Sequence, residues 1–289
     1  MPKLVRGLCE SSIFLSDQYK AMVELGVGAN MVSAIRTWGK EMGVMEEDKE
    51  NKGFCPTSFG QAVFGHGGHD EFLEDQSTLW LLHWNLCTQK HPLHAWYYMI
   101  NHWHKADFSS SEVLVEFAKD EKSTEASRKR HLDVFLRTYA GSSAAKNEVQ
   151  EDNLDSPLVE LNFIRKIGDR TLSSENDSGR RESIYSFRFE SKPEISDELF
   201  VYCLADYWSK FSSSEETLDF SSIGSGAYSL GQVFKLPESS IRKRLENMER
   251  ITDGAYAFDD SAAIPRVVRS GDLLNADVLL SAVYESTFS

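Results

Sequence analysis

The stretch LGVGANMVSAIRTWGKEMGVM at residues 25–45 decides the fold, because its apolar side chains recur at helical spacing. One side of the expected helix is apolar and carries Met31, Val32, Ile35, Trp38 and Met42. The opposite side is polar or basic and carries Asn30, Ser33, Arg36, Thr37 and Lys40. A shorter helix over residues 18–25 precedes it, and Gly26-Val27-Gly28 predicts a tight turn between the two.

Two helices joined by a tight glycine-containing turn form a helix-turn-helix, whose second helix enters a DNA major groove. The acidic stretch EEDKENKG at 46–53 is typical of a solvated loop or a wing tip, and TSFGQAVF at 57–64 suits the first piece of a wing. We therefore predict a winged helix over residues 1–65. Winged helices bind DNA or dock other proteins, and the pattern alone fits both.

A buried helical connector is predicted over residues 66–107. TLWLLHWNLC at 78–87 is apolar nearly all round, which is typical of a buried helix. The aromatic residues that follow, at 96–108, fit a core helix or a platform for unpaired bases. His66 and His69 lie beside four acids in GHGGHDEFLED, which fits a metal site or a polar turn leading into a helix N-terminus.

Two further units of the same kind are predicted. Over residues 108–190 a helix opening with Ser-x-x-Glu, a second helix at 125–140 and two strands around a polar loop at 168–182 repeat the first plan. Residues 191–289 give a long apolar helix, a helix-turn-helix at 229–251, a hairpin at 255–269 and a closing helix. The fold class is therefore mainly α with small β wings (α+β), as tandem winged helix-turn-helix units joined by buried helices.

Basic side chains concentrate on the second helix of each of these later units. We expect both clusters to contact DNA phosphates; they comprise Arg128, Lys129, Arg130 and Arg137, and Arg242, Lys243 and Arg244.

Composition narrows the class of protein. The chain has 289 residues and a net charge of −14, which argues against a general polyanion binder but leaves room for one basic face. Its four cysteines include no C-x-x-C pair, which suits a reducing cytosol. No apolar run approaches the roughly 20 residues of a membrane span. Together, the cysteines and the lack of a membrane span lead us to expect a cytoplasmic protein. Gly26-Val27-Gly28 lacks the preceding strand and the third glycine of a dinucleotide-binding loop, so we expect no organic cofactor.

Several phrases, read in order, resemble a bacterial family known only as a domain of unknown function, DUF4007. These phrases are LGVGANMVSAIRTW, FLEDQSTLWLLHWNL, FLRTY, EDNLDSPLVELNFI, YSFRF, LADYW and GQVFKL, and with their flanks they run from about Phe14 to Arg269. The family usually opens with a motif containing His-Glu-Thr-Phe and an arginine, whereas this sequence opens with MPKLVRGLCESSIF. Any role that depends on that motif is not expected of these residues.

The resemblance implies a place in DNA phosphorothioation and phage-defence gene clusters, beside sulfurtransferase-like or ATPase proteins, and a DNA-nicking role in one such system. Nicking by metal-assisted hydrolysis needs carboxylates that hold Mg²⁺ or Mn²⁺. The candidate catalytic acids are Glu74, Asp75, Asp152 and Asp155, with Asp152 and Asp155 as metal ligands. Taken singly, Asp75 and Asp155 also fit helix caps or turn residues.

Three functions remain open at the level of sequence. The first is a DNA-binding component with metal-dependent nicking activity. The second is a non-catalytic adaptor that holds a sulfurtransferase or ATPase partner on DNA. The third is a lone transcription factor, which requires a dimer and a palindromic site.

Overall fold

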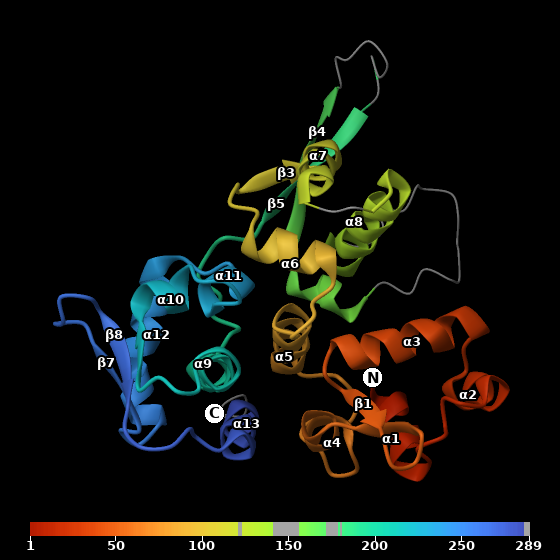
Figure 1. Cartoon of the computed structure of the whole chain (residues 1–289), viewed down its shortest axis with the longest axis horizontal. Coiled ribbons are helices and arrows are strands. Elements are labelled where there is room, and N and C mark those ends of the chain that lie inside the picture. Colours follow the sequence, from red (N-terminus) through yellow and green to blue (C-terminus); the bar gives the residue numbers. More distant parts are fainter. Residues whose placement is uncertain (121–122, 141–155, 172–178, 180, 286–289) are drawn as a thin grey trace. The chain divides into compact units, whose positions relative to one another are not determined.

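The computed structural model describes residues 1–120, 123–140, 156–171, 179 and 181–285 (Figure 1). The chain divides into two compact units, each built from several segments. The first unit comprises Met1–Pro92, Pro193–Ile223 and Arg242–Ser289, and the second comprises Leu93–Lys192 and Gly224–Ile241. Helices dominate and small antiparallel sheets complete the fold, which confirms the α+β class. The four-part division at residues 65, 107 and 190 stays a prediction.

The first unit begins with a run of short helices and one hairpin. In chain order these elements are α1 (Pro2–Glu10), α2 (Gln18–Leu25), α3 (Ala29–Glu41), β1 (Met45–Asp48), β2 (Gly53–Pro56), α4 (Ser58–Phe64) and α5 (Gln76–Cys87). The later elements are α9 (Asp197–Phe211), β6 (Thr217–Asp219), α10 (Phe220–Gly224), α12 (Glu238–Ile251), β7 (Tyr256–Asp259), β8 (Arg266–Arg269) and α13 (Ala276–Glu285). The ends of α10 and α12 include residues that belong to the second unit.

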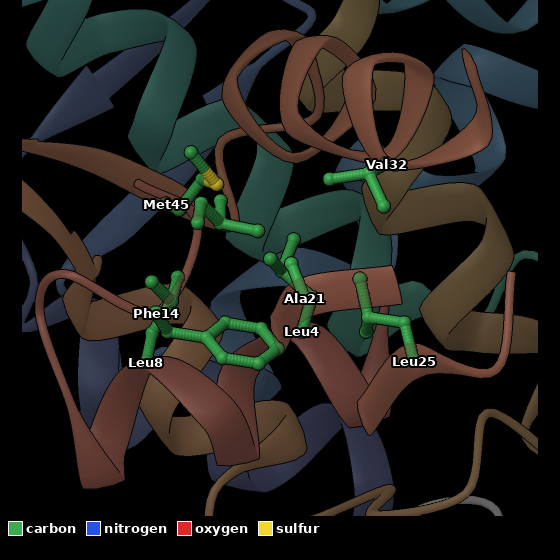
Figure 2. Packing of buried hydrophobic residues seen from close by; sticks show 8 residues of the cluster. Leu4, Leu8, Phe14, Ala21, Leu25, Val32 and Met45 are labelled. Carbon is green, nitrogen blue, oxygen red and sulfur yellow. The ribbon is translucent and has the colours of Figure 1, made fainter. Parts of the chain in front are cut away.

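The predicted pair of helices α2 and α3 is present, and an apolar cluster fixes it. Asp17 caps α2 by accepting a hydrogen bond from the Lys20 amide at 3.1 Å. Gly26 ends α2 at φ 71°, a left-handed conformation that favours glycine. Figure 2 shows side chains of α1, α2, α3 and β1 gathered in one cluster; the buried members are Leu4, Leu8, Phe14, Leu15, Ala21, Leu25, Val32 and Met45.

The hairpin that follows α3 differs from the predicted wing. TSFGQAVF forms helix α4 and not a strand, because Thr57 caps it through the Gly60 amide at 2.9 Å. The strands come instead from the acidic stretch and the residues after it, and Glu46 pairs with Cys55 in an antiparallel register. Gly60 is required for this packing, since a Cβ there would lie 2.0 Å from the Val44 carbonyl oxygen.

The second unit contains one three-stranded sheet and its helices. Its elements are α6 (His94–Asn101), β3 (Asp107–Ser109), α7 (Ser110–Asp120), α8 (Glu125–Ala140), a 3-10 helix η1 (Pro157–Leu161), β4 (Ile164–Thr171), β5 (Arg181–Phe187) and α11 (Leu230–Phe234). The predicted Ser-x-x-Glu start of α7 is confirmed, because the Ser109 amide donates to Glu112 at 3.1 Å. The first of the two strands predicted around the polar loop begins later than expected. Its opening residues form the 3-10 helix η1, which Ser156 caps and in which Pro157 is the first residue. Strands β4 and β5 also extend into the segment predicted to be a loop.

Both units contain a sheet of the same topology. In the second unit β3 pairs with β5 and β5 pairs with β4, and in the first unit β6, β8 and β7 follow the same order. In each case two or more helices separate the first strand from the hairpin.

The predicted buried helices are confirmed. All but two residues of α5 are buried, and the Trp84 indole donates to Asp206 on α9 at 2.7 Å. In α6 the side chains of Trp96, Met99 and Ile100 are buried, so this aromatic stripe belongs to a core. No helix among the described residues is long and apolar enough to cross a membrane.

Candidate nucleic-acid interface

The exposed side of α3 carries the polar residues that the sequence places there. Asn30, Ser33, Arg36 and Thr37 are exposed, and we call these four residues the α3 face. Lys40 is half-buried, as are Met31, Ile35 and Trp38 on the apolar side, whereas Val32 and Met42 are buried. No acidic residue occurs in α3 before Glu41, so this face has no negative charge of its own.

Arg36 is the free cation of the α3 face. It makes no hydrogen bond or ion pair with any residue that the structure describes. The Thr37 hydroxyl, in contrast, donates to the Ser33 carbonyl oxygen at 3.1 Å within the helix. Arg36 therefore has its full set of donors available for an external anion or base.

Lys40 is held by the neighbouring hairpin. Its Nζ lies 2.5 Å from Glu47 Oε1 on β1 and 5.0 Å from the ring centre of Phe54 on β2. The hydrogen bond from Lys40, followed by its charge, lowers the pKa of Glu47, so the pair is intact at neutral pH. The positive charge of α3 that remains unpaired is thus at Arg36.

Three side chains from outside α3 bind the last carbonyl groups at its end. Gln89 donates to the Glu41 oxygen at 3.0 Å, Asn85 to the Met42 oxygen at 3.2 Å, and Thr57 to the Gly43 oxygen at 2.6 Å. A helix leaves its final carbonyls without intrahelical partners, so these bonds fix the end of α3. Sequence reasoning missed all three residues, because no local pattern links positions 14 to 48 residues apart.

The second candidate surface lies on α8. Lys129, Arg130 and Arg137 are exposed, and we call them the α8 face. None of the three forms an ion pair with a described residue. Arg128 differs, because its guanidinium donates to the Ser123 carbonyl oxygen and is half-buried. The buried side of α8 holds Leu132, Phe135, Leu136 and Tyr139, as predicted.

The third candidate cluster, on α12, is divided by the structure. Arg242 pairs with Asp260 and lies over the Phe220 ring at 4.8 Å. Arg244 is 7% exposed, donates to the Ile195 carbonyl oxygen and pairs with Asp197 at 3.2 Å. Burial lowers the pKa of Arg244, which the charge of Asp197 partly offsets. Of these three residues only Lys243 is exposed, and it forms no ion pair with a described residue.

Two of the candidate catalytic acids, Glu74 and Asp75, lie in the described residues, directly before α5. Asp75 caps α5 by accepting from the Ser77 amide at 2.7 Å. Asp70 accepts from the amides of Glu74 and Asp75 at 2.8 and 3.1 Å, which makes this segment a turn. No group of three or more metal-ligating side chains occurs within the described parts of the chain, and the catalytic role of Glu74 and Asp75 stays a prediction. Asp152 and Asp155 lie outside the described residues.

The histidines near this turn have separate environments. His69 stacks on Tyr284 of α13, with ring centres 4.8 Å apart and planes 4° apart. Its Nε2 lies 3.4 Å from the Ser281 hydroxyl. His66 is exposed and contributes to no ligand group among the described residues. The polar-turn interpretation therefore describes this segment better than the metal site.

Comparisons with known proteins identify the family. A magnesium ion-bound SspB crystal structure is similar with a TM-score of 0.81, and an SspB crystal structure with 0.78. Each is 20% identical to this sequence, and the match covers 100% of this chain and 84% of the SspB chain. At this identity the likeness establishes a shared fold. No curated protein matches the chain. The family described as "Protein of unknown function (DUF4007)" matches residues 3–284, and the chain therefore belongs to the DUF4007 family.

Proposed function

We propose that this chain is a DNA-binding component of a DNA backbone phosphorothioation and phage-defence system. Membership of DUF4007 and the SspB fold support the system, because the sequence resemblance implies such gene clusters. The α3 face supports DNA binding. It presents an unpaired arginine and no carboxylate, although the chain as a whole has a net charge of −14.

The order of elements supports a winged helix-turn-helix interpretation of this surface. Helices α2 and α3 are joined by a glycine turn and followed by the β1–β2 hairpin. The second unit offers α7, α8 and the β4–β5 hairpin in the same order. In such units the second helix enters the major groove, which makes α3 and α8 the DNA-reading helices of this proposal.

The α3 face is tested by an Arg36→Ala variant in a duplex-binding titration by fluorescence anisotropy. We expect a loss of about 1–3 kcal/mol if Arg36 contacts a base, and less if it contacts a phosphate. The matched control is Arg250→Ala on α12, where an exposed arginine lies one residue after Glu249 and one turn after Glu246. Both variants remove one exposed positive charge from a helix, so a difference between their DNA affinities reports a specific contact of Arg36 with DNA.

Equal affinity of the wild type and Arg36→Ala, with unchanged circular dichroism, would remove α3 from the interface. Absence of duplex binding by the wild type at low salt would remove the DNA-binding proposal altogether. Low salt is the right condition, because phosphate contacts weaken steeply as salt rises.

Metal-dependent nicking is the second activity that we propose for this component. Its support is the magnesium ion bound to the similar SspB structure. The Asp75 carboxylate caps α5, whereas only the backbone amide of Glu74 is bonded, so we place the test of nicking on Asp152 and Asp155. We expect Asp152→Asn or Asp155→Asn to abolish conversion of supercoiled plasmid to open circles in Mg²⁺ or Mn²⁺.

The control for the nicking assay is Asp75→Asn. Asparagine caps a helix about as well as aspartate, so this variant keeps its fold and loses only the charge. Full nicking by Asp152→Asn and Asp155→Asn would contradict the proposed ligands. Binding of plasmid without any conversion would favour the alternative function, an adaptor that docks a sulfurtransferase-like or ATPase partner on DNA.

A further inference from the structure

A small hollow lies beside the α3 face, between α3 and the start of α2. It has a volume of about 220 Å³ and is lined by Leu15, Ser16, Gln18, Val32, Ser33 and Arg36. One water occupies about 30 Å³ in the liquid, so the hollow has room for several waters or for one phosphodiester group. Two residues of the α3 face, Ser33 and Arg36, thus share a cavity with two residues of the preceding segment.

The chemistry of the lining is that of an anion site with donors on its rim. Ser16, Gln18, Ser33 and Arg36 are exposed, whereas Leu15 and Val32 are buried and form the apolar floor. Hydroxyl, amide and guanidinium groups are the side-chain donors that proteins use toward DNA phosphates. The side chains of Ser16, Gln18, Ser33 and Arg36 make no hydrogen bond with a described residue, so their donors are available.

The acid nearest in sequence does not line the hollow. Asp17 stands between Ser16 and Gln18, but its carboxylate accepts from the Lys20 amide as the cap of α2. Lys20 itself pairs with Glu24 at 3.7 Å, so it does not supply the charge of the site. Arg36 is therefore the cation that balances an anion here.

We propose that this hollow seats one phosphate of the DNA backbone at the edge of the groove that α3 enters. The inference rests on the proposed DNA binding and assigns it a subsite. In a helix-turn-helix the first helix crosses the backbone while the second lies in the groove. The hollow lies between these two helices, with Gln18 and Ser16 on the side of α2 and Arg36 and Ser33 on α3.

The experiment combines a protein variant with a chemically altered duplex. A methylphosphonate replaces one backbone phosphate at a time and removes its charge, and each duplex is titrated with wild type and Gln18→Ala. We expect one position where the methylphosphonate weakens binding by Gln18→Ala less than it weakens binding by the wild type, because the variant has already lost one contact to that phosphate. At that position the slope of log affinity against log salt becomes shallower by about 0.9.

The chain offers a close control in Gln76→Ala. Gln76 is also an exposed glutamine at the first position of a helix, directly after a capping aspartate. We expect Gln76→Ala to bind every duplex like the wild type. Gln18 is exposed, so its replacement leaves the fold intact, which equal melting temperatures of the two variants check.

Three outcomes distinguish failure of the phosphate site from failure of the proposed DNA binding. No binding by the wild type overturns the DNA-binding function itself. Binding in which Gln18→Ala and the methylphosphonates act independently at all positions overturns the hollow as a phosphate site. Loss of affinity on changing bases, together with insensitivity to every methylphosphonate, also overturns it.

Discussion

At the scale of single residues, neighbouring carboxylates decide which basic side chains are available to DNA. Lys40 and Arg36 lie one helical turn apart on α3, yet Lys40 is paired with Glu47 and Arg36 is unpaired among the described residues. Glu47 belongs to the acidic hairpin, which therefore reduces the positive charge at the end of α3. We therefore expect this ion pair to lower the proposed DNA affinity.

Replacing Glu47 with glutamine is expected to raise DNA affinity by releasing Lys40. If Lys40 then reaches a phosphate, the slope of log affinity against log salt becomes steeper by about 0.9. The pair is well exposed, so we expect the free energy of unfolding to stay close to that of the wild type. Anisotropy titrations at several salt concentrations measure the slope.

Glu50→Gln is the control for this prediction. It removes the same charge from the same hairpin, but the Glu50 side chain forms no ion pair with a described residue. Equal slopes for the two variants would show that net charge, and not release of Lys40, changes the affinity.

Helical spacing predicted the residues of the α3 face, because a helix with one apolar side necessarily exposes the other. Helical spacing argues against a single face for the α12 cluster, which was predicted from a run of three basic residues. Successive residues of a helix point about 100° apart, so Arg242, Lys243 and Arg244 cannot share one face. The structure separates them into a paired, an exposed and a buried side chain. A run of consecutive basic residues is therefore weaker evidence for a basic helix face than the same residues spaced one turn apart.

At the scale of elements, the end of α3 is fixed by bonds from outside the helix. The Thr57 hydroxyl donates to the Gly43 carbonyl oxygen and also accepts from the Gly60 amide at 2.9 Å. One hydroxyl thus ties the end of α3 to the start of α4. The hydroxyl, and not the shape of the side chain, makes both bonds.

We expect Thr57→Val to lower the free energy of unfolding by about 1–3 kcal/mol, because it leaves the Gly43 carbonyl oxygen and the Gly60 amide without this hydrogen-bond partner. Thr57→Ser keeps the hydroxyl and is expected to stay close to the wild type. Urea unfolding of the three proteins measures the difference, and hydrogen exchange is expected to quicken at residues 42–45 in the valine variant alone. Identical midpoints for valine and serine would rule out the hydroxyl as the link.

Long amphipathic or wholly apolar elements were predictable, whereas short ones were not. Helices α3, α5, α8 and α9 follow from periodicity or uniform hydrophobicity over more than ten residues. TSFGQAVF is too short to show a period, and its helix depends on the cap at Thr57. The acidic strand β1 contradicts ordinary strand preferences, and its pairing with β2 sets it in place.

At the scale of the whole molecule, the sequence predicted the mixture of helices and small hairpins but not the division into units. Each unit combines segments distant in the chain, and contacts of that kind leave no local trace in the sequence. The α3 face lies in the first unit and the α8 face in the second. Each unit thus carries positive charge that is unpaired among the described residues, in a chain of net charge −14.

The α8 face is tested by replacing Lys129, Arg130 and Arg137 together with alanine. We expect a shallower dependence of log affinity on log salt, by about 0.9 for each phosphate contact that is lost. The control replaces Arg6, Lys20 and Arg266, which already pair with Glu71, Glu24 and Asp259. Both triple variants lower the net charge by three, so a general charge effect moves both slopes equally. A change confined to the α8 variant establishes a contact, while equal slopes would mean that these three side chains are merely solvated. Combining the α8 variant with Arg36→Ala then tests whether both faces bind the same duplex, because independent contacts lower the slope additively.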